Sequence, residues 1–147
     1  MNKILVTGGS GMVGHAVKQV CPSADYPTRK ELDLLDEEAV KDFVKDGHYN
    51  FVIHLAAKVG GVKANTDYVA GFYTDNCKIN SNVLHASMLA GVEKVVSLLS
   101  TCVYPDKVTY PITEEQLHLG PPHPSNFGYA YSKRMVDVQS RAYRQQH

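Results

Sequence analysis

The strongest constraint on what this chain can fold into is the glycine-rich stretch at residues 8–14, GGSGMVG, which directly follows the apolar run at residues 3–7. The apolar run is typical of a buried strand. The apolar residues from Met12 to Val20 recur at helical spacing. Glycines between a strand and a helix permit a sharp turn, a close approach of a ligand to the backbone, and tight packing of the helix on the sheet. Since the N-terminus of a helix favours a bound anion, the pattern indicates a dinucleotide-binding loop.

The glycine spacing fits two registers of such a loop. Gly8, Gly11 and Gly14 give GxxGxxG, whereas Gly9, Gly11 and Gly14 give the commoner GxGxxG. A tight turn with no ligand is the structural alternative, because any short strand-to-helix connection can use glycine. The rest of the chain has to decide between these interpretations.

The remainder of the chain alternates strands with helices. Residues 24–28 form a poor strand, since Pro27 cannot donate a ladder hydrogen bond. We expect a helix that ends at Gly47, a strand at 51–55, a long helix with Gly91 as its cap, a strand at 95–99, a long loop, and a last helix from about Asn126. This order predicts an α/β fold with a doubly wound, Rossmann-like parallel sheet. Ligands of such sheets bind at the carboxyl ends of the strands, where the glycine turn, the turn after Leu55 and residues 100–102 fall.

Composition narrows the class of protein. A chain of 147 residues predicts one domain, with a core that needs no disulfide or metal. Fifteen basic and fifteen acidic residues are interspersed, so no basic patch indicates a nucleic-acid partner. Three cysteines without CxxC spacing suit reduced thiols in the cytoplasm. We find no signal peptide and no apolar run long enough to span a membrane.

A YxxxK motif at residues 129–133 carries the candidate chemistry. On a helix, Tyr129 and Lys133 lie one turn apart on the same face. A nearby ammonium can lower the pKa of a phenol from about 10 toward neutrality, as proton transfer to a carbonyl oxygen requires. Ser100, at the end of a strand, could hydrogen-bond the same oxygen, whereas Tyr131 has Met135 four residues on and no cation. Taken alone, YxxxK is usually a surface pair.

Taken together, the motifs resemble those of a known family. They are TGGSGMVG at 7–14, TRKELDLLD at 28–36, HLAA at 54–57, AKVGG at 57–61, STCVYP at 100–105, NFGY at 126–129 and YAYSK at 129–133. The chain resembles the extended branch of the short-chain dehydrogenase/reductase superfamily and, within it, the GDP-4-keto-6-deoxymannose 3,5-epimerase/4-reductases. The similarity covers essentially the whole chain.

The resemblance implies an NADP site. Its pyrophosphate would be held by Gly8, Ser10, Gly11, Met12, Val13 and Gly14. Arg29 would meet the 2′-phosphate, since a guanidinium matches phosphate geometry; otherwise it is a solvated loop charge. The other implied cofactor contacts are Asp33 and Leu34 at the adenine, then Leu55, Ala56, Ala57, Val59, Asn76, Tyr129 and Lys133. For Asn76 the alternative is a polar helix residue that the backbone satisfies.

The resemblance also implies the catalytic groups. Ser100, Tyr129 and Lys133 match the reductive triad, and Cys102 matches a cysteine that moves protons during epimerisation at carbons 3 and 5. Without the family, Cys102 would be a small buried residue. The implied substrate is a GDP-sugar, and no metal is implied.

Members of the family are considerably longer chains. The resemblance therefore implies that residues 1–147 are the NADP-binding domain, truncated, with the fold incomplete at its C-terminal side and the substrate domain absent. It further implies a homodimer through the helices at 72–90 and 126–147. Two alternatives stay open: a non-catalytic NADP-binding fragment, and an NAD-dependent nucleotide-sugar epimerase with the same fold.

Overall fold

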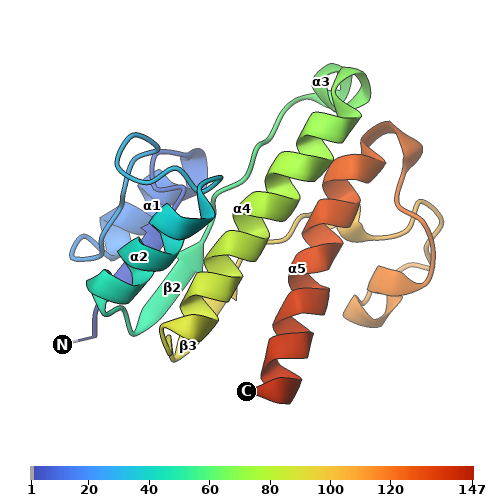
Figure 1. Cartoon of the computed structure of the whole chain (residues 1–147). Coiled ribbons are helices and arrows are strands. Elements are labelled where there is room, and N and C mark those ends of the chain that lie inside the picture. The colour runs from blue at the N-terminus through green and yellow to red at the C-terminus, as the bar shows by residue number, and fades with distance from the viewer. Residues whose placement is uncertain (1) are drawn as a thin grey trace. The chain divides into compact units, whose positions relative to one another are not determined.

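The computed structural model describes residues 2–147, with strands and helices in alternation (Figure 1). Their order is β1 (Ile4–Thr7), α1 (Met12–Val20), α2 (Glu37–Gly47), β2 (Phe51–His54), α3 (Val62–Asp67), α4 (Val69–Leu89), β3 (Lys94–Ser97), the 3₁₀ turns η1 (Thr101–Val103), η2 (Glu114–His118) and η3 (Pro124–Asn126), and α5 (Phe127–Gln146). The described residues form two compact units. The first is drawn from residues 2–57 and Lys78–Leu98, the second from Lys58–Cys77 and Leu99–His147.

The first unit contains a three-stranded parallel sheet in the order β1-β2-β3. On the other side of β1, Leu5 forms a single parallel bridge with Asp25. The weak strand expected at 24–28 is thus reduced to one bridge, and Pro27 lies just beyond it. The parallel alternation of strands and helices confirms the predicted fold class.

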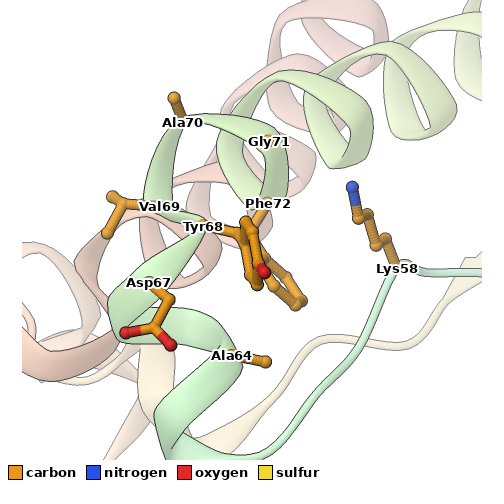
Figure 2. A pocket seen from close by; sticks show the side chains of 8 residues that line it. All are labelled: Lys58, Ala64, Asp67, Tyr68, Val69, Ala70, Gly71 and Phe72. Carbon is orange, nitrogen blue, oxygen red and sulfur yellow. The ribbon is translucent and has the colours of Figure 1, made fainter.

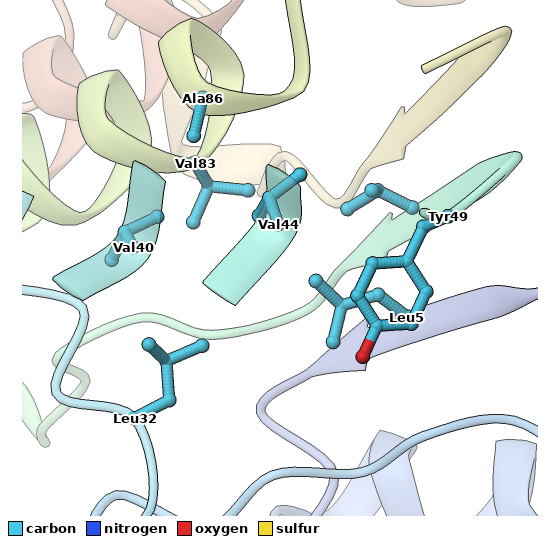
Figure 3. Close-up of a cluster of buried hydrophobic side chains, with 8 residues drawn as sticks. Leu5, Leu32, Val40, Val44, Tyr49, Val83 and Ala86 are labelled. Carbon is cyan, nitrogen blue, oxygen red and sulfur yellow. The ribbon is translucent and has the colours of Figure 1, made fainter. Parts of the chain in front are cut away.

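One face of this sheet is covered by α2 and the second part of α4. Figure 3 shows the cluster that they form with the sheet; its buried residues are Leu5, Leu32, Val40, Val44, Tyr49, Val52, Val83 and Ala86. The helical spacing of Val40 and Val44, and of Val83 and Ala86, brings each pair onto one side of its helix. Burial of these side chains is the main apolar stabilisation of the unit.

Helix ends follow their local signals. Asp36 caps α2, because its side chain accepts a hydrogen bond from the Ala39 N–H. The helix ends at Gly47 as predicted, although the left-handed residue is His48. After α4, Gly91 has φ +69°, and the N–H groups of Gly91 and Val92 donate to the last turn. This is the glycine cap predicted for the long helix.

The apolar side of α1 differs from what its spacing indicates. The helix forms as predicted, but Met12 is 88% exposed and Val20 83% exposed, and Gly14 is its one buried residue. The physical reason is that α1 packs on the preceding loop at Gly14. The larger side chains of α1 do not take part in this contact, and Met12 and Val20 stay exposed.

The second unit holds α3, the first part of α4, the 3₁₀ turns and α5. The sequence did not predict the short helix α3, because its six residues are too few to show an apolar period. At the start of α5, a Cβ on Gly128 would lie 2.8 Å from the Val69 carbonyl oxygen. Glycine therefore permits the first turns of α4 and α5 to pack closely.

The long loop between η1 and α5 is tied to itself and to α5. Gln116 exchanges two hydrogen bonds with the backbone of Thr109, each 3.0 Å long. His118 contacts Asp137 of α5 at 2.8 Å, and Arg141 contacts the same carboxylate at 2.7 Å. These contacts fix the loop against the helix that carries Tyr129 and Lys133.

Candidate functional site

The glycine turn is built so that only glycine fits at two of its positions. Gly8 has φ +78°, and a Cβ there would lie 2.6 Å from the Ala56 nitrogen. A Cβ on Gly14 would lie 2.5 Å from both the Gly8 oxygen and the Gly9 Cα. Such distances are shorter than van der Waals contact. The glycine turn, which joins β1 to α1, therefore lies against the segment after β2. These are two of the three segments that we expected to face a ligand.

The turn also presents the N-terminus of α1. Gly11 precedes the helix without a side-chain cap, and its N–H donates to the Gly8 oxygen at 3.0 Å. Ser10, Met12 and Val13 are exposed around this end. An uncapped helix N-terminus beside bare glycine backbone can accept a pyrophosphate. The residues present therefore fit a dinucleotide.

Tyr26 is a part of this turn that the sequence did not reveal. A Cβ on Gly9 would lie 2.7 Å from the Tyr26 ring, so the ring covers Gly9 directly. The Tyr26 hydroxyl donates to the Cys21 oxygen at 2.7 Å, and the Lys18 ammonium lies 5.4 Å from the ring centre. Gly9 is therefore required because the Tyr26 ring lies against it. Gly8 and Gly14 are required by the backbone of the turn itself, so the register of the loop is GxxGxxG.

A row of polar residues occupies the carboxyl ends of the strands. Thr7, His54 and Ser97 lie side by side in register across β1, β2 and β3. His54 is fully buried; its Nδ1 contacts the Thr7 hydroxyl at 2.7 Å and its Nε2 contacts Asn80 Oδ1 at 3.1 Å. Because amide oxygens only accept, Nε2 carries the proton and Nδ1 accepts from Thr7. A histidine within an apolar strand was the available signal for this network.

Arg29 is positioned as an exposed cation near a turn. Its side chain is 80% exposed and pairs loosely with Asp33, at 4.0 Å. The neighbouring Glu31 accepts hydrogen bonds from the Thr28 N–H and hydroxyl, and these bonds lower the pKa of its carboxyl. Asp33 accepts from the Leu35 N–H, while Leu34 packs partly against the core.

The residues after β2 have different surroundings. Leu55, Ala56 and Ala57 are half-buried, whereas Val59 is 71% exposed. They continue from β2 into the segment that the glycine turn touches at Ala56. Their predicted contacts with a cofactor remain predictions.

Asn76 is fully buried and used by the backbone around it. Its amide oxygen accepts from the Lys58 N–H at 2.8 Å, and its amide nitrogen donates to the Lys58 and Phe72 oxygens. Both amide hydrogens are therefore engaged. These bonds hold the Lys58 segment against α4 and match the structural alternative given for Asn76. Its contact with a cofactor stays a prediction.

Ser100 and Cys102 lie on the 3₁₀ turn that follows β3. Ser100 caps η1, and its hydroxyl oxygen accepts from the Cys102 N–H at 3.5 Å and from the Cys102 thiol at 3.2 Å. Both residues are half-buried. The turn thus holds a hydroxyl and a thiol in contact.

Tyr129 and Lys133 meet this turn from α5. Burial and the nearby Cys102 raise the pKa of the Tyr129 phenol, while a hydrogen bond with Ser100 lowers it. Burial lowers the pKa of Lys133, and Cys102 opposes that shift. Ser100, Cys102, Tyr129 and Lys133 therefore form one cluster within the second unit.

The phenol differs from the sequence expectation in one respect. We expected Lys133 to lower the pKa of Tyr129, but the group that lowers it in the structure is Ser100, and the net shift is upward. The physical reason is that the phenol is buried, and burial disfavours the phenolate. A raised pKa keeps Tyr129 protonated at neutral pH.

A separate pocket of about 520 Å³ lies in the second unit (Figure 2). It is lined by Lys58, Ala64, Asp67, Tyr68, Val69, Ala70, Gly71 and Phe72. The Lys58 ammonium lies 2.7 Å from Asp75 and 5.6 Å from the centre of the Phe72 ring. The pocket includes none of the predicted site residues.

Two kinds of feature are absent from residues 2–147. Within this range, no helix combines the length and apolar character needed to cross a membrane. Over the same residues, no group of three or more His, Cys, Asp or Glu side chains is arranged to hold a metal ion.

Known proteins show the same sequence pattern and fold. The chain is 44% identical to the GDP-L-fucose synthase of Dictyostelium discoideum, with 98% of this chain and 47% of that protein covered. It is 39% identical to the enzyme of that name from Sinorhizobium fredii, with 99% and 48% covered. The chain spans about half the length of the curated relatives it matches.

Solved structures agree. The crystal structure of a GDP-L-fucose synthetase from Naegleria fowleri bound to NADP superimposes with a TM-score of 0.90 at 44% identity, covering 99% of this chain and 45% of that one. The predicted resemblance and Rossmann-like fold are thereby confirmed. The model of the NAD dependent epimerase/dehydratase family matches residues 4–147, almost the whole chain, so the chain belongs to that family.

Proposed function

We propose that this chain is the cofactor-binding half of an NADPH-dependent epimerase/reductase that converts GDP-4-keto-6-deoxy-D-mannose to GDP-L-fucose. The names of its relatives support this substrate, and the NADP in the Naegleria structure supports the cofactor. The observation that carries the proposal is the cluster of Ser100, Cys102, Tyr129 and Lys133 on η1 and α5.

The reductive step needs a proton at the C4 oxygen of the sugar. Bound NADPH supplies the hydride to C4. Tyr129, protonated at neutral pH, donates its phenolic proton to the C4 oxygen. Ser100 hydrogen-bonds the same region, and Lys133 is the cation that can stabilise the resulting phenolate.

The epimerisation step needs a base near C3 and C5. Protons on these carbons are acidic, because each carbon adjoins the 4-keto group. Cys102 is the proposed group that removes a proton there, as its thiolate, and each centre inverts when the proton returns on the opposite face of the sugar ring. Its contact with Ser100 and its proximity to Lys133 place it in the same cluster as the proton donor.

We propose that NADP binds at the glycine turn, with the pyrophosphate at the N-terminus of α1 and Arg29 on the 2′-phosphate. The bare backbone at Gly8 and Gly14 supports the first contact, and the exposure of Arg29 supports the second. The further contacts proposed are those of Asp33, Leu34 and residues 55–59.

Changing Arg29 to Ala should weaken NADPH binding by about tenfold to a hundredfold while leaving NADH binding nearly unchanged. The reason is that only NADPH carries the phosphate that a guanidinium would pair with. Fluorescence titration of both cofactors measures the two dissociation constants. Lys30→Ala is the matched control, since it removes a neighbouring exposed cation. Equal losses for NADPH and NADH would remove the proposed role of Arg29.

A second candidate function is a non-catalytic NADP-binding chain. Incubating the chain with NADPH and GDP-4-keto-6-deoxymannose distinguishes the two functions, since turnover excludes a purely binding role. A third candidate keeps the fold but uses NAD on another nucleotide-sugar, and the cofactor titration tests it.

We also propose a homodimer formed by the helices at 72–90 and 126–147, in the cytoplasm, where the three free thiols would stay reduced. Its support is a stripe of exposed apolar side chains along α5, at Phe127, Tyr131, Met135 and Val138. Light scattering at micromolar concentration should give twice the chain mass. A Met135→Glu, Val138→Glu double variant should give the single mass, and a monomeric wild type would contradict the proposal.

A further inference from the structure

Arg134 joins the two elements that carry the four clustered residues. Its Nε donates to the Val103 carbonyl oxygen at 2.6 Å. Arg134 is 6% exposed and Val103 2% exposed, so the bond lies inside the second unit. Arg134 directly follows Lys133 in α5, and Val103 directly follows Cys102 in η1.

The bond is strong for its position. A charged donor on a neutral acceptor contributes more than a neutral pair, and a buried carbonyl left without a donor is costly. The guanidinium also lies 5.3 Å from the centre of the Tyr131 ring, which restricts the plane in which Nε can donate. Among the described residues, its Nη2 is buried without a hydrogen-bond partner, whereas its Nε donates to Val103.

We propose that Arg134 is a positioning residue that holds the Ser100–Cys102 turn in register with Tyr129 and Lys133. The inference rests on the proposed function for its catalytic meaning, whereas its geometric part stands without it. Because η1 is only three residues long, it has little internal structure of its own. The buried bond at Val103 therefore acts together with the Tyr129–Ser100 hydrogen bond to set where the Ser100 hydroxyl and the Cys102 thiol lie relative to α5.

Two substitutions separate the donor from the charge. Gln has an amide nitrogen the same number of bonds from Cα as Nε of Arg, so Arg134→Gln keeps a donor toward Val103. Arg134→Met has similar length and no donor. Both remove the charge and the stacking over Tyr131. If Nε–H is what positions the turn, the Gln variant behaves like the wild type and the Met variant does not.

The first readout is alkylation of Cys102 by iodoacetamide, followed by mass spectrometry of the peptides. In the Met variant we expect Cys102 to react at least about fivefold faster, because the released turn loses its Ser100 contact and admits reagent. In the Gln variant the rate should stay within about twofold of the wild type. Cys21, in the other unit, is the internal control and should not change.

Every outcome decides the proposal. Unchanged Cys102 rates in both variants overturn it, and equal acceleration in both assigns the effect to charge or packing instead. If the Met variant fails to fold, the Gln variant still decides, since a fivefold faster Cys102 there contradicts a positioning donor.

The second readout links position to chemistry. With NADPH and GDP-4-keto-6-deoxymannose, the Met variant should lose at least about tenfold in kcat with the KM for NADPH changed less than about twofold, and the Gln variant should restore kcat. A wild type without turnover would count against the proposed function alone, because the alkylation rates still test the placement of the turn.

Discussion

Replacing Tyr129 by Phe should reduce NADPH oxidation with GDP-4-keto-6-deoxymannose by about a thousandfold, while NADPH affinity changes less than about threefold. The substitution removes one hydroxyl and keeps the ring that is half-buried beside Cys102. Without that hydroxyl no phenolic proton reaches the C4 oxygen. Stopped-flow absorbance gives the rate, and fluorescence titration gives the affinity.

The matched control is Tyr110→Phe, which removes the hydroxyl of a tyrosine that is largely exposed. It should retain the wild-type rate. The pH dependence follows from the direction of the Tyr129 shift: since its pKa is raised, the protonated donor persists to higher pH than a free phenol would. The rate should therefore fall only at strongly alkaline pH. Wild-type turnover in the Phe variant would exclude Tyr129 as the proton donor.

Changing Gly14 to Ala should both destabilise the chain and abolish tight binding of NADPH. The new Cβ would meet the Gly8 oxygen and the Gly9 Cα, each at 2.5 Å, so the turn must move. Overpacking of this kind costs about 1–3 kcal/mol, against a gain of about 1 kcal/mol in helix propensity. We expect a net loss of up to about 2 kcal/mol in the free energy of unfolding and a loss of at least about a hundredfold in NADPH affinity.

Gly11→Ala serves as the stability control for that experiment. Its Cβ would lie 3.3 Å from the Gly8 oxygen, a contact that a small shift relieves. Urea denaturation without cofactor should place this variant within about 0.5 kcal/mol of the wild type. If Gly14→Ala were equally stable and bound NADPH normally, the close packing of α1 on the turn would have no bearing on the cofactor site.

Features whose causes lie within a few residues could be predicted from the sequence. The apolar run before Gly8 gave β1, and Gly91 ended the long helix because only a residue tolerant of positive φ closes that turn. The weakness of the strand near Pro27 could also be predicted, since proline lacks the N–H donor that a ladder needs. The resemblance to the family then predicted four catalytic residues, Ser100, Cys102, Tyr129 and Lys133. All four lie in one unit of the structure.

Other features depend on where distant segments meet. The Thr7–His54 contact joins residues 47 apart, and the Arg134–Val103 bond joins residues 31 apart. The exposure of Met12 and the cause of the pKa shift of Tyr129 likewise depend on which residues pack against them in the folded chain.

The sequence by itself determined the alternation of strands and helices, the glycine turn and the residues that carry the candidate chemistry. Local backbone geometry and side-chain chemistry are properties of the residues themselves, so the amino-acid sequence is enough to predict them. Only the tertiary structure decided that Tyr26 covers Gly9, that Ser100 rather than Lys133 lowers the pKa of Tyr129, and that Arg134 donates to the Val103 oxygen. Burial and hydrogen bonding are properties of the surroundings, and the surroundings exist only once the chain has folded.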